Sequence, residues 1–210
     1  MSNKKTKSIL EPLSFNRYIV KVLKEVSPDT EITGNAVNQL NSLLSTIAEK
    51  ISLKSNLLTL HANKKTINTR AVNNAVLLLF SKISSSLISP GIKAVIAFAS
   101  SRKKKGTKMS QSKLSNLIFP VARVKNIMKK YSLNGIRISQ NSSIFLTAVL
   151  EQITAKILEQ SAAISRDDKK TRITPRHLLL SMHNDEELLS ILKCFNWSIT
   201  GGGVLPNIHK

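Results

Sequence analysis

The expected fold of this chain is decided by two similar stretches, Lys64-Lys65-Thr66-Ile67-Asn68-Thr69-Arg70 and Lys169-Lys170-Thr171-Arg172-Ile173-Thr174-Pro175-Arg176. They stand 105 positions apart in a chain of 210 residues, as expected of two fused copies of one supersecondary unit. Each follows a long segment with helical apolar periodicity and precedes a shorter one. Its lysines supply positive charge beside a helix start, where free N–H groups and the helix dipole favour an anion. We therefore expect two tandem modules, each presenting a phosphate-binding loop.

The first half of the chain is predicted to form a short, a long and a short helix, followed by an extra one. The predicted helices run over Phe15–Val26, from a Thr33 cap through Leu58, from a Thr69 cap through Phe80, and around Leu87–Phe98. Ser27-Pro28 ends the first helix, because the residue before proline avoids the helical region. The long helix carries its apolar residues every three to four positions, at Val37, Leu40, Leu44, Ile47, Ile51 and Leu58. Ser81–Ser86 is expected to be a spacer.

The second half repeats this plan. Its predicted helices run from a Ser110 cap to Leu117, from Phe119-Pro120-Val121 to Tyr131, and over Asn141–Arg166. The long helix places Leu146, Leu150, Ile153, Ile157 and Ile164 on one face. Thr174 followed by Pro175 is a helix-start signature. Asn184 is expected to cap a last helix whose first turn is acidic, which suits the helix dipole.

Composition divides the chain into four parts. Residues 1–13 are a short basic arm, and residues 102–109 are a basic linker whose like charges repel each other. Two helical modules occupy residues 14–101 and 110–210, the second ending in a non-helical docking segment. A long helix between short ones has a broad apolar face but no compact core of its own. We therefore expect the modules to clasp each other within one chain.

Charge is the strongest global signal. Lys and Arg number 32 against 12 Asp and Glu, which gives a net charge of +20 and a pI near 10.3. Such a field attracts polyanions, either nucleic acid or an anionic membrane surface. No apolar run approaches the roughly 18 residues of a membrane span, and one cysteine, Cys194, excludes an internal disulfide and a multi-cysteine zinc site. We expect an intracellular, nuclear or particle-internal protein.

Several sequence stretches in both modules resemble the core histones. Residues 18–30 (YIVKVLKEVSPDT), 63–70 (NKKTINTR) and 89–95 (SPGIKAV) resemble core histone 2B. Residues 119–124 (FPVARV), 148–159 (AVLEQITAKILE), 166–178 (RDDKKTRITPRHL), 184–188 (NDEEL) and 202–208 (GGVLPNI) resemble core histone 2A. Together the matches cover roughly residues 14–101 and 110–208. A fused 2B–2A order resembles the histone doublets of large DNA viruses.

This resemblance implies an all-α protein in which two tandem histone folds form an intramolecular handshake pair. It implies a structural role: the doublet would stand in for one 2A–2B dimer and wrap double-stranded DNA in a nucleosome-like particle. The nucleosome is the known example of wrapping through backbone contacts, minor-groove arginines and DNA deformability. The implied partners are histone 3- and histone 4-like proteins, which could be a second fused doublet, and a second copy of the chain itself. The implied location is chromatin, in the virion and in the host-cell nucleus or viral replication site.

The resemblance also implies two DNA-facing ends, because in paired histone folds the first loop of one module lies beside the second loop of the other. One end would use Thr33, Gly34 and Asn35 with Lys169, Lys170, Thr171 and Arg172. The other would use Arg137 and Ile138 with Lys64, Lys65 and Thr66. Arg123 and Lys129 would add a basic helix face. One isolated lysine pair is usually a solvated charge run, whereas two matching pairs in matching contexts favour phosphate binding.

A set of acidic residues matches the family's acidic patch, a docking surface for arginine side chains of partner proteins: Glu151, Glu159, Asp185, Glu186 and Glu187. Lys156 stands where the family carries an acid, and Ile83 and Pro90 stand where additional acids would fall. A lysine amid these acids weakens their negative potential. Helix-start electrostatics alone would also explain residues 185–187, so both interpretations remain open.

Two other classes of function have less support. A histone-fold transcription factor would need base-edge readers or an added recognition segment, and the sequence offers neither. An enzyme would need a nucleophilic triad, paired carboxylates, a metal site or a nucleotide fingerprint, and none is evident. The four histidines have no metal-like spacing with one another or with Cys194. We expect no catalytic residue, metal, cofactor, small-molecule substrate or membrane partner.

Overall fold

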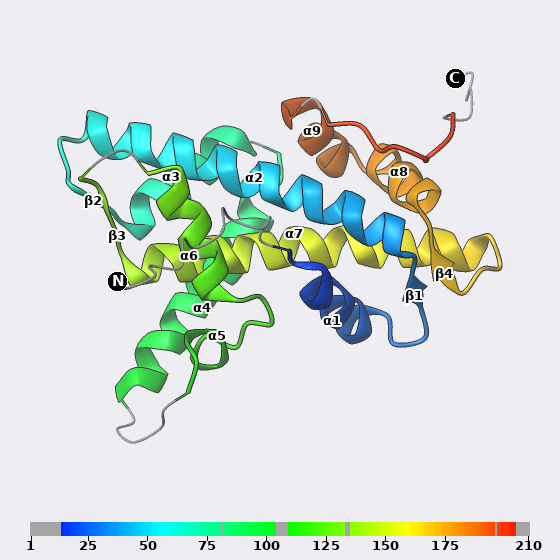
Figure 1. The fold of residues 1–210 in the computed structure, drawn as a ribbon, viewed down its shortest axis with the longest axis horizontal. Helices are drawn as coiled ribbons and strands as arrows, with labels where there is room; N and C mark the ends of the chain where they lie inside the picture. The colour runs from blue at the N-terminus through cyan, green and yellow to red at the C-terminus, as the bar shows by residue number, and fades with distance from the viewer. Residues whose placement is uncertain (1–13, 81, 104–108, 133–134, 196, 205–210) are drawn as a thin grey trace, which may run out of the picture.

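The computed structural model describes residues 14–80, 82–103, 109–132, 135–195 and 197–204, and it is mostly helical (Figure 1). The first half contains α1 (Asn16–Val26), β1 (Glu31–Ile32), α2 (Gly34–His61), β2 (Thr66–Ile67), α3 (Thr69–Leu79) and α4 (Ser84–Lys103). The second half contains α5 (Gln111–Leu114), α6 (Val121–Lys130), β3 (Arg137–Ile138), α7 (Gln140–Asp167), β4 (Arg172–Ile173), α8 (Pro175–Asn184) and α9 (Glu186–Phe195). The predicted all-α class and the short–long–short helix order are confirmed in both halves. The predicted arm at residues 1–13 and most of the predicted linker lie outside the described residues.

Two 28-residue helices, α2 and α7, form the centre of the molecule. They lie side by side along the long axis, and the shorter helices pack around them (Figure 1). The apolar positions predicted for α2 are buried from Val37 to Ile51, and those predicted for α7 are buried from Leu146 to Ile157. Because each stripe is covered by the other module, most of the buried residues of both halves form one shared hydrophobic core.

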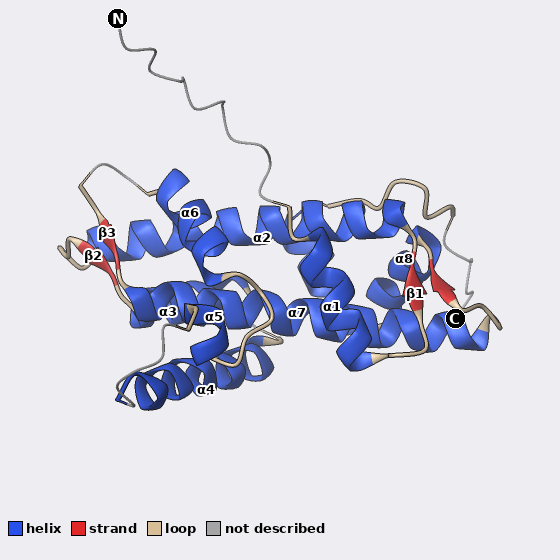
Figure 2. Ribbon diagram, turned by 60° about the horizontal axis from the view of Figure 1, so that its bottom comes forward, coloured by secondary structure: helices blue, strands red, loops and turns tan. Residues whose placement is uncertain are grey.

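The two modules are joined by two short parallel strand pairs at opposite ends of the long helices (Figures 1 and 2). At one end β1 pairs with β4, with Glu31 opposite Arg172 and Ile32 opposite Ile173. At the other end β2 pairs with β3, with Thr66 opposite Arg137 and Ile67 opposite Ile138. Each pair therefore joins the first loop of one module to the second loop of the other, as predicted for a handshake.

Side chains also cross between the modules. The rings of Phe15 and Phe119 stack with their centroids 5.3 Å apart, and both residues are fully buried. The Nδ2 group of the buried Asn56 on α2 donates to the backbone carbonyl of Tyr131 at the end of α6, over 2.7 Å. Among the described residues the main core is thus continuous through the boundary between the halves.

Helix caps follow the strand pairs. Thr33 and Thr174 directly follow β1 and β4, and both are the predicted N-cap residues. The predicted cap at Thr69 is wrong: Asn68 directly follows β2, and its side chain accepts the N–H of Ala71 at 2.9 Å. The strand register explains this, because it leaves the first residue after each strand extended and free to cap.

Two other predicted boundaries are corrected. The Ser81–Ser86 spacer is shorter than predicted, because α4 begins at Ser84, where the fully buried Ile83 and Leu87 hold the segment on the core. Asn184 does not cap α9, because it is the last residue of α8. The cap is Asp185, whose Oδ1 accepts the N–H groups of Glu187 and Leu188 at 2.7 and 3.1 Å.

Close packing of α4 on α7 depends on Gly91. A Cβ at this position would lie 2.6 Å from Cε2 of the fully buried Phe145 ring. We expect Gly91→Ala to lower the free energy of unfolding by about 1–3 kcal/mol, the usual cost of overpacking a core. Urea unfolding followed by circular dichroism measures this change.

Gly34 provides the matched control. It opens α2, and a Cβ there would meet no atom within 4 Å. Gly34→Ala is therefore expected to leave stability unchanged or to raise it by about 0.4–1 kcal/mol, through the lost freedom of the unfolded chain. Equal losses in the two variants would contradict the packing assigned to Gly91.

Candidate nucleic-acid interface

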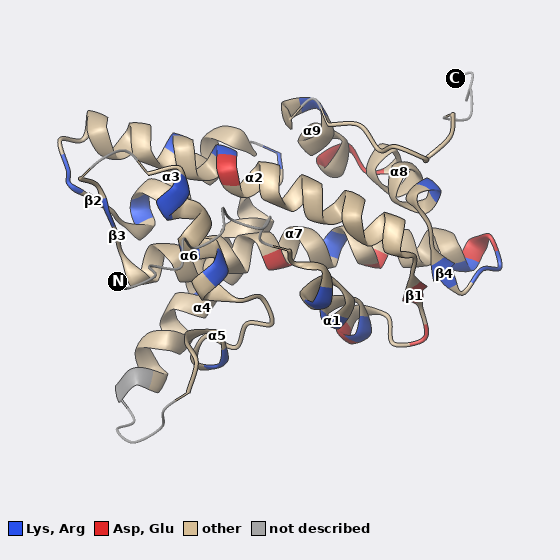
Figure 3. Cartoon of the chain, in the orientation of Figure 1, with Lys and Arg blue, Asp and Glu red and all other residues tan. Residues whose placement is uncertain are grey.

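Lysine and arginine gather at both strand-paired ends of the molecule and on α1 and α6 between them (Figure 3). The structure brings together the residues predicted for each end, because β1–β4 and β2–β3 join the loops that carry them. The sites at the two ends are built in the same way. A short strand ladder fixes the backbone, and exposed basic side chains project from the chain on either side of it.

At the β1–β4 end, Lys169, Lys170, Thr171 and Arg172 are all exposed. Lys169 has a left-handed backbone (φ 55°), which turns the chain sharply after α7. The Ser165 hydroxyl donates to the carbonyls of Lys170 and Arg172, at 3.0 and 3.2 Å, and so holds the loop against the helix end. Gly34 and Asn35 are exposed on the first turn of α2, while the Thr33 hydroxyl accepts the N–H of Ala36 as the helix cap.

Arg172 is engaged by a neighbour that sequence reasoning missed. Its Nε donates to Oε2 of Glu31, the residue opposite it in the β1–β4 pair, at 2.7 Å. Both side chains are more than half exposed, and exposed ion pairs are worth at most about 1 kcal/mol. Opening this pair would therefore cost little. The feature of the sequence that could have predicted this ion pair is an acidic residue, Glu31, two positions before the Thr33 cap.

At the β2–β3 end, Lys64, Lys65, Thr66 and Arg137 are exposed. Asn63 turns the chain after α2 with φ 52°, matching the left-handed residue at the other end. Ile138 differs from the rest of the predicted set, because its side chain is half-buried against the core. It can offer a ligand only its backbone.

Between the ends, α1 and α6 supply a third basic region. Arg123 is half-buried: its guanidinium lies over the Tyr18 ring, 5.3 Å from the centroid, and donates to the carbonyl of Ser14. Lys129 is exposed. A groove of about 850 Å³ runs between α1 and the α5–α6 region and is lined by five lysines, Lys21, Lys24, Lys113, Lys125 and Lys129, together with Glu25.

Four of these lysines were not predicted as site residues. Lys21 and Lys24 stand three apart on α1, and Lys125 and Lys129 stand four apart on α6, so each pair shares one helix face. That spacing is the feature of the sequence that could have predicted a basic face on each helix. What it does not reveal is that the two helices face one groove, which depends on the Phe15–Phe119 contact.

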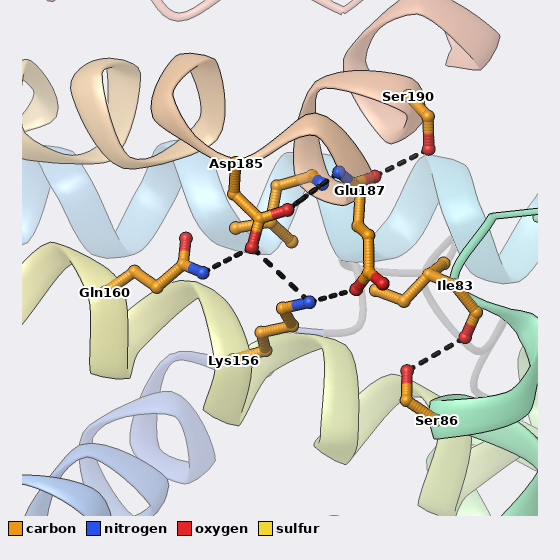
Figure 4. A network of polar contacts seen from close by, with 8 residues as sticks. Ile83, Ser86, Lys156, Gln160, Asp185, Glu187 and Ser190 are labelled. Atoms are coloured by element: carbon orange, nitrogen blue, oxygen red, sulfur yellow. Dashed lines mark hydrogen bonds and ion pairs between the residues drawn. The ribbon is translucent and has the colours of Figure 1, made fainter.

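The predicted acidic patch is largely occupied by the chain's own groups (Figure 4). Lys156 forms ion pairs with Glu187 and, at 3.4 Å, with Asp185, which also accepts from the Gln160 side chain. Lys82 pairs with the exposed Glu186 at 3.4 Å. The sequence analysis did not predict that Lys82 neutralises Glu186. It considered only the neighbouring Ile83, which is fully buried.

The two remaining acids of the patch differ from each other. Glu159 is exposed on α7. Glu151 is half-buried, and its Oε2 accepts the backbone N–H groups of Ile118 and Phe119, both at 2.8 Å. Burial raises the pKa of Glu151 above its ordinary value, although these two hydrogen bonds act in the opposite direction.

The ion pairs around Lys156 shift two pKa values. Partial burial opposes the charge of Asp185, but hydrogen bonds from Gln160 and from two backbone N–H groups, with Lys156 nearby, lower its pKa. Partial burial likewise opposes the charge of Lys156, yet Glu187 and Asp185 raise its pKa. The stability from Asp185 is thus present above its unfolded-state pKa and is lost as the pH falls through its folded-state pKa.

Lys156→Gln tests this network. We expect the pKa of Asp185 to rise toward its ordinary value, because Lys156 no longer favours its carboxylate. Acidification should then lower the free energy of unfolding by less than in the unaltered protein. Carboxyl ¹³C chemical shifts recorded against pH report this directly. Lys82→Gln is the control, because the ion pair of Lys82 is with the exposed Glu186. An unchanged Asp185 titration in Lys156→Gln would refute the network.

Other kinds of site find no support in the described part of the chain. No group of three or more His, Cys, Asp or Glu there could hold a metal ion. No described helix is long and apolar enough to cross a membrane. His177, one of the four histidines of the chain, is fully buried at the start of α8. Its Nδ1 accepts the backbone N–H of Thr174 at 3.2 Å.

A family model and several known proteins match this chain. The family model for the core histone domain, shared by histones 2A, 2B, 3 and 4, matches residues 1–78 and again residues 97–184. The histone 2A.Z of Lodderomyces elongisporus is 48% identical over 101 residues, which cover 48% of this chain and 74% of that protein. The histone 2A.Z of Mycosarcoma maydis is 42% identical over 120 residues, covering 57% and 85%. The histone 2A.1 of Saccharomyces cerevisiae is 46% identical over 101 residues, which cover 48% of this chain and 74% of that protein.

Proposed function

Because this chain belongs to the core histone family, we propose that it is a structural protein that packages double-stranded DNA. The observation that carries the proposal is the arrangement of the two strand-paired ends. Each presents an exposed lysine pair, Lys64-Lys65 or Lys169-Lys170, on a backbone fixed by the other module. Lysines act as mobile point charges for phosphates, and Arg137 and Arg172 can enter a narrow minor groove.

The DNA path that we propose runs from one paired end, over the lysine-lined groove between α1 and α6, to the other end. Three basic regions in succession along the long axis support it (Figure 3). The contacts that we propose in all three regions are made by lysine and arginine with phosphates. Binding through phosphates alone is tolerant of sequence, because the backbone carries no sequence information.

We further propose that the chain replaces one 2A–2B dimer, with a 2B-like module at residues 14–101 followed by a 2A-like module at 110–210, the order of viral histone doublets. The relatives named as 2A-type histones support the 2A-like half. The proposed location is chromatin, in the virion and in the host nucleus or viral replication site.

The proposed partners within the particle are a histone 3- and histone 4-like pair and a second copy of the chain. An apolar surface supports a helical protein partner. Leu53, Leu57 and Leu60 recur along one side of α2 and are all exposed, and α3, which packs on α2, exposes Leu77 and Leu78. Exposed apolar residues at helical spacing are typical of a face that another helix covers.

A DNA-binding experiment tests the core of this proposal. Fluorescence anisotropy of labelled duplexes of many sequences should give similar affinities, each falling steeply with salt because phosphate contacts release counterions. A preference for one sequence beyond about 1,000-fold is typical of specific binders and would favour a transcription factor instead. Affinity that is independent of salt would remove the phosphate contacts from the account.

A further inference from the structure

We propose that His177 is a positioning residue of the β1–β4 end, which draws the carboxylate of Asp168 toward the core and away from the lysine pair that follows it. The inference rests on the proposed function, because it concerns how one of the two ends binds DNA. Asp168 directly precedes Lys169 and Lys170. Its negative charge would oppose phosphate binding there unless another group engaged it.

The imidazole of His177 has one nitrogen committed to the start of α8 and the other facing Asp168. Its side chain is 1% exposed, and Nδ1 accepts the backbone N–H of Thr174 at 3.2 Å. A neutral imidazole that accepts through one nitrogen carries its proton on the other, so the proton is assigned to Nε2. Nε2 lies 3.3 Å from Oδ2 of Asp168, although among the described residues it has no partner aligned for a hydrogen bond. A buried N–H without a partner is unfavourable, which favours a carboxylate turned toward it.

Asp168 stands where a helix disfavours an acid. It is the C-cap of the long helix α7, and the negative end of the helix dipole opposes a carboxylate at that position. Of the ion pairs between described residues, Asp168 makes one, and its partner is His177. Neither Lys169 nor Lys170 pairs with it. His177 is therefore the group that accounts for the position of this carboxylate.

The β2–β3 end has the same backbone plan without this contact. At both ends, the N–H of the second residue after the long helix's C-cap donates to a carbonyl of the last helical turn, at 3.0 Å in the first module and 2.8 Å in the second. The C-cap is Ala62 at one end and Asp168 at the other. Ala71 and His177 each stand three residues after the N-cap of the next helix. The chain thus carries its own control, an end with two alanines in place of the acid and the histidine.

Two substitutions separate the two nitrogens of His177. Gln can place an amide N–H near the position of Nε2 and keep the contact with Asp168, whereas Asn places its amide near Nδ1 and loses that contact. In His177→Asn the released carboxylate pairs with a lysine of the loop, so one phosphate contact is lost. We expect this variant to weaken duplex DNA binding about fivefold at about 0.15 M salt, and His177→Gln to change it by less than about twofold. Fluorescence anisotropy measures both affinities, and equal losses in the two variants would overturn the proposal.

Asp168→Asn is expected to rescue the first variant, because its amide oxygen can still accept a hydrogen bond but carries no charge. In the His177→Asn background it should restore the affinity about fivefold, and in the unaltered protein it should change it by less than about twofold. Removing a charge at Asp168 would not relieve a role of His177 in folding alone. Equal effects of Asp168→Asn in both backgrounds would refute the coupling.

A second cycle assigns the effect to one end of the molecule. The loss in His177→Asn should disappear when the Lys169-Lys170 pair is alanine, because residues that act together are not additive. It should persist when the Lys64-Lys65 pair is alanine, because distant residues act independently. The same loss in both backgrounds would contradict an effect through the lysine loop of the β1–β4 end.

NMR of the full chain without DNA tests the contact with His177 left in place. Nitrogen-15 signals of the imidazole should show the proton on Nε2, and Asp168→Asn should move the Nε2 signal but not the signals of the exposed His61. A proton on Nδ1, or an Nε2 signal that ignores Asp168→Asn, would overturn the proposal whatever the DNA affinities. Absence of DNA binding by the unaltered protein would instead refute the proposed function, and the NMR result would still decide whether His177 holds Asp168.

Discussion

Replacing Lys64, Lys65, Lys169 and Lys170 together by alanine is expected to weaken duplex DNA binding roughly 10³-fold at about 0.15 M salt. The estimate assumes that each lysine neutralises one phosphate. Each such contact changes the slope of log K against log salt by about 0.9, so the four together should reduce the steepness of that slope by about 3.6. All four side chains are exposed, so the fold should not change. Fluorescence anisotropy at several salt concentrations gives both numbers.

A charge-matched control distinguishes contact from net charge. Lys169→Ala with Lys170→Ala should weaken binding about 30-fold, the effect of two phosphate contacts. Lys82→Ala with Lys193→Ala removes the same charge from exposed positions on the α4 and α9 side and should have a much smaller effect. If both double variants lose the same affinity, the basic residues act through net charge, and the paired ends have no special role.

Phe145→Ala is expected to lower the free energy of unfolding of the whole chain by about 3–5 kcal/mol, the usual cost of removing a buried aromatic ring. Phe145 stands on α7 of the second half, is 0% exposed, and fills the space left by Gly91 on α4 of the first half. Its loss therefore loosens the contact between the modules. Because domains are typically stable by only about 5–15 kcal/mol, much of the total would be lost.

Urea unfolding measured by circular dichroism and by Trp197 fluorescence tests this cost. The two probes should report one transition, because the halves share one core. Leu60→Ala is the control: Leu60 is 44% exposed on α2, so truncation should change stability by no more than about 0.5–1 kcal/mol. Two separate transitions, with Phe145→Ala affecting only one of them, would contradict a single interlocked core.

The helices were largely predictable because their apolar residues recur at helical spacing over many turns. The stripe from Val37 to Ile51 and the stripe from Leu146 to Ile157 are buried as predicted. Boundaries were harder to predict. Asn68 and Thr69 are both capping residues, and the choice between them depends on where β2 ends, which is decided by pairing with a strand 71 positions away.

The paired ends were also predictable, because the lysine loops occur twice and resemble a known family. The contacts that modify the predicted basic and acidic sites were not predictable. The ion pair of Arg172 with Glu31 joins residues 141 positions apart, and the pair of Lys82 with Glu186 joins residues 104 apart. Local pattern reports which charges exist, whereas tertiary packing decides which of them meet. The α1–α6 lysine groove was missed for the same reason.

Nuclease protection tests whether the two paired ends belong to one DNA-wrapping surface. DNA of mixed sequence is reconstituted with this protein and a histone 3- and histone 4-like pair, then digested with micrococcal nuclease. Protected fragments of one discrete length are expected, and a shorter length or none when Lys64, Lys65, Lys169 and Lys170 are alanine. A smooth smear of fragments from the unaltered protein would contradict it.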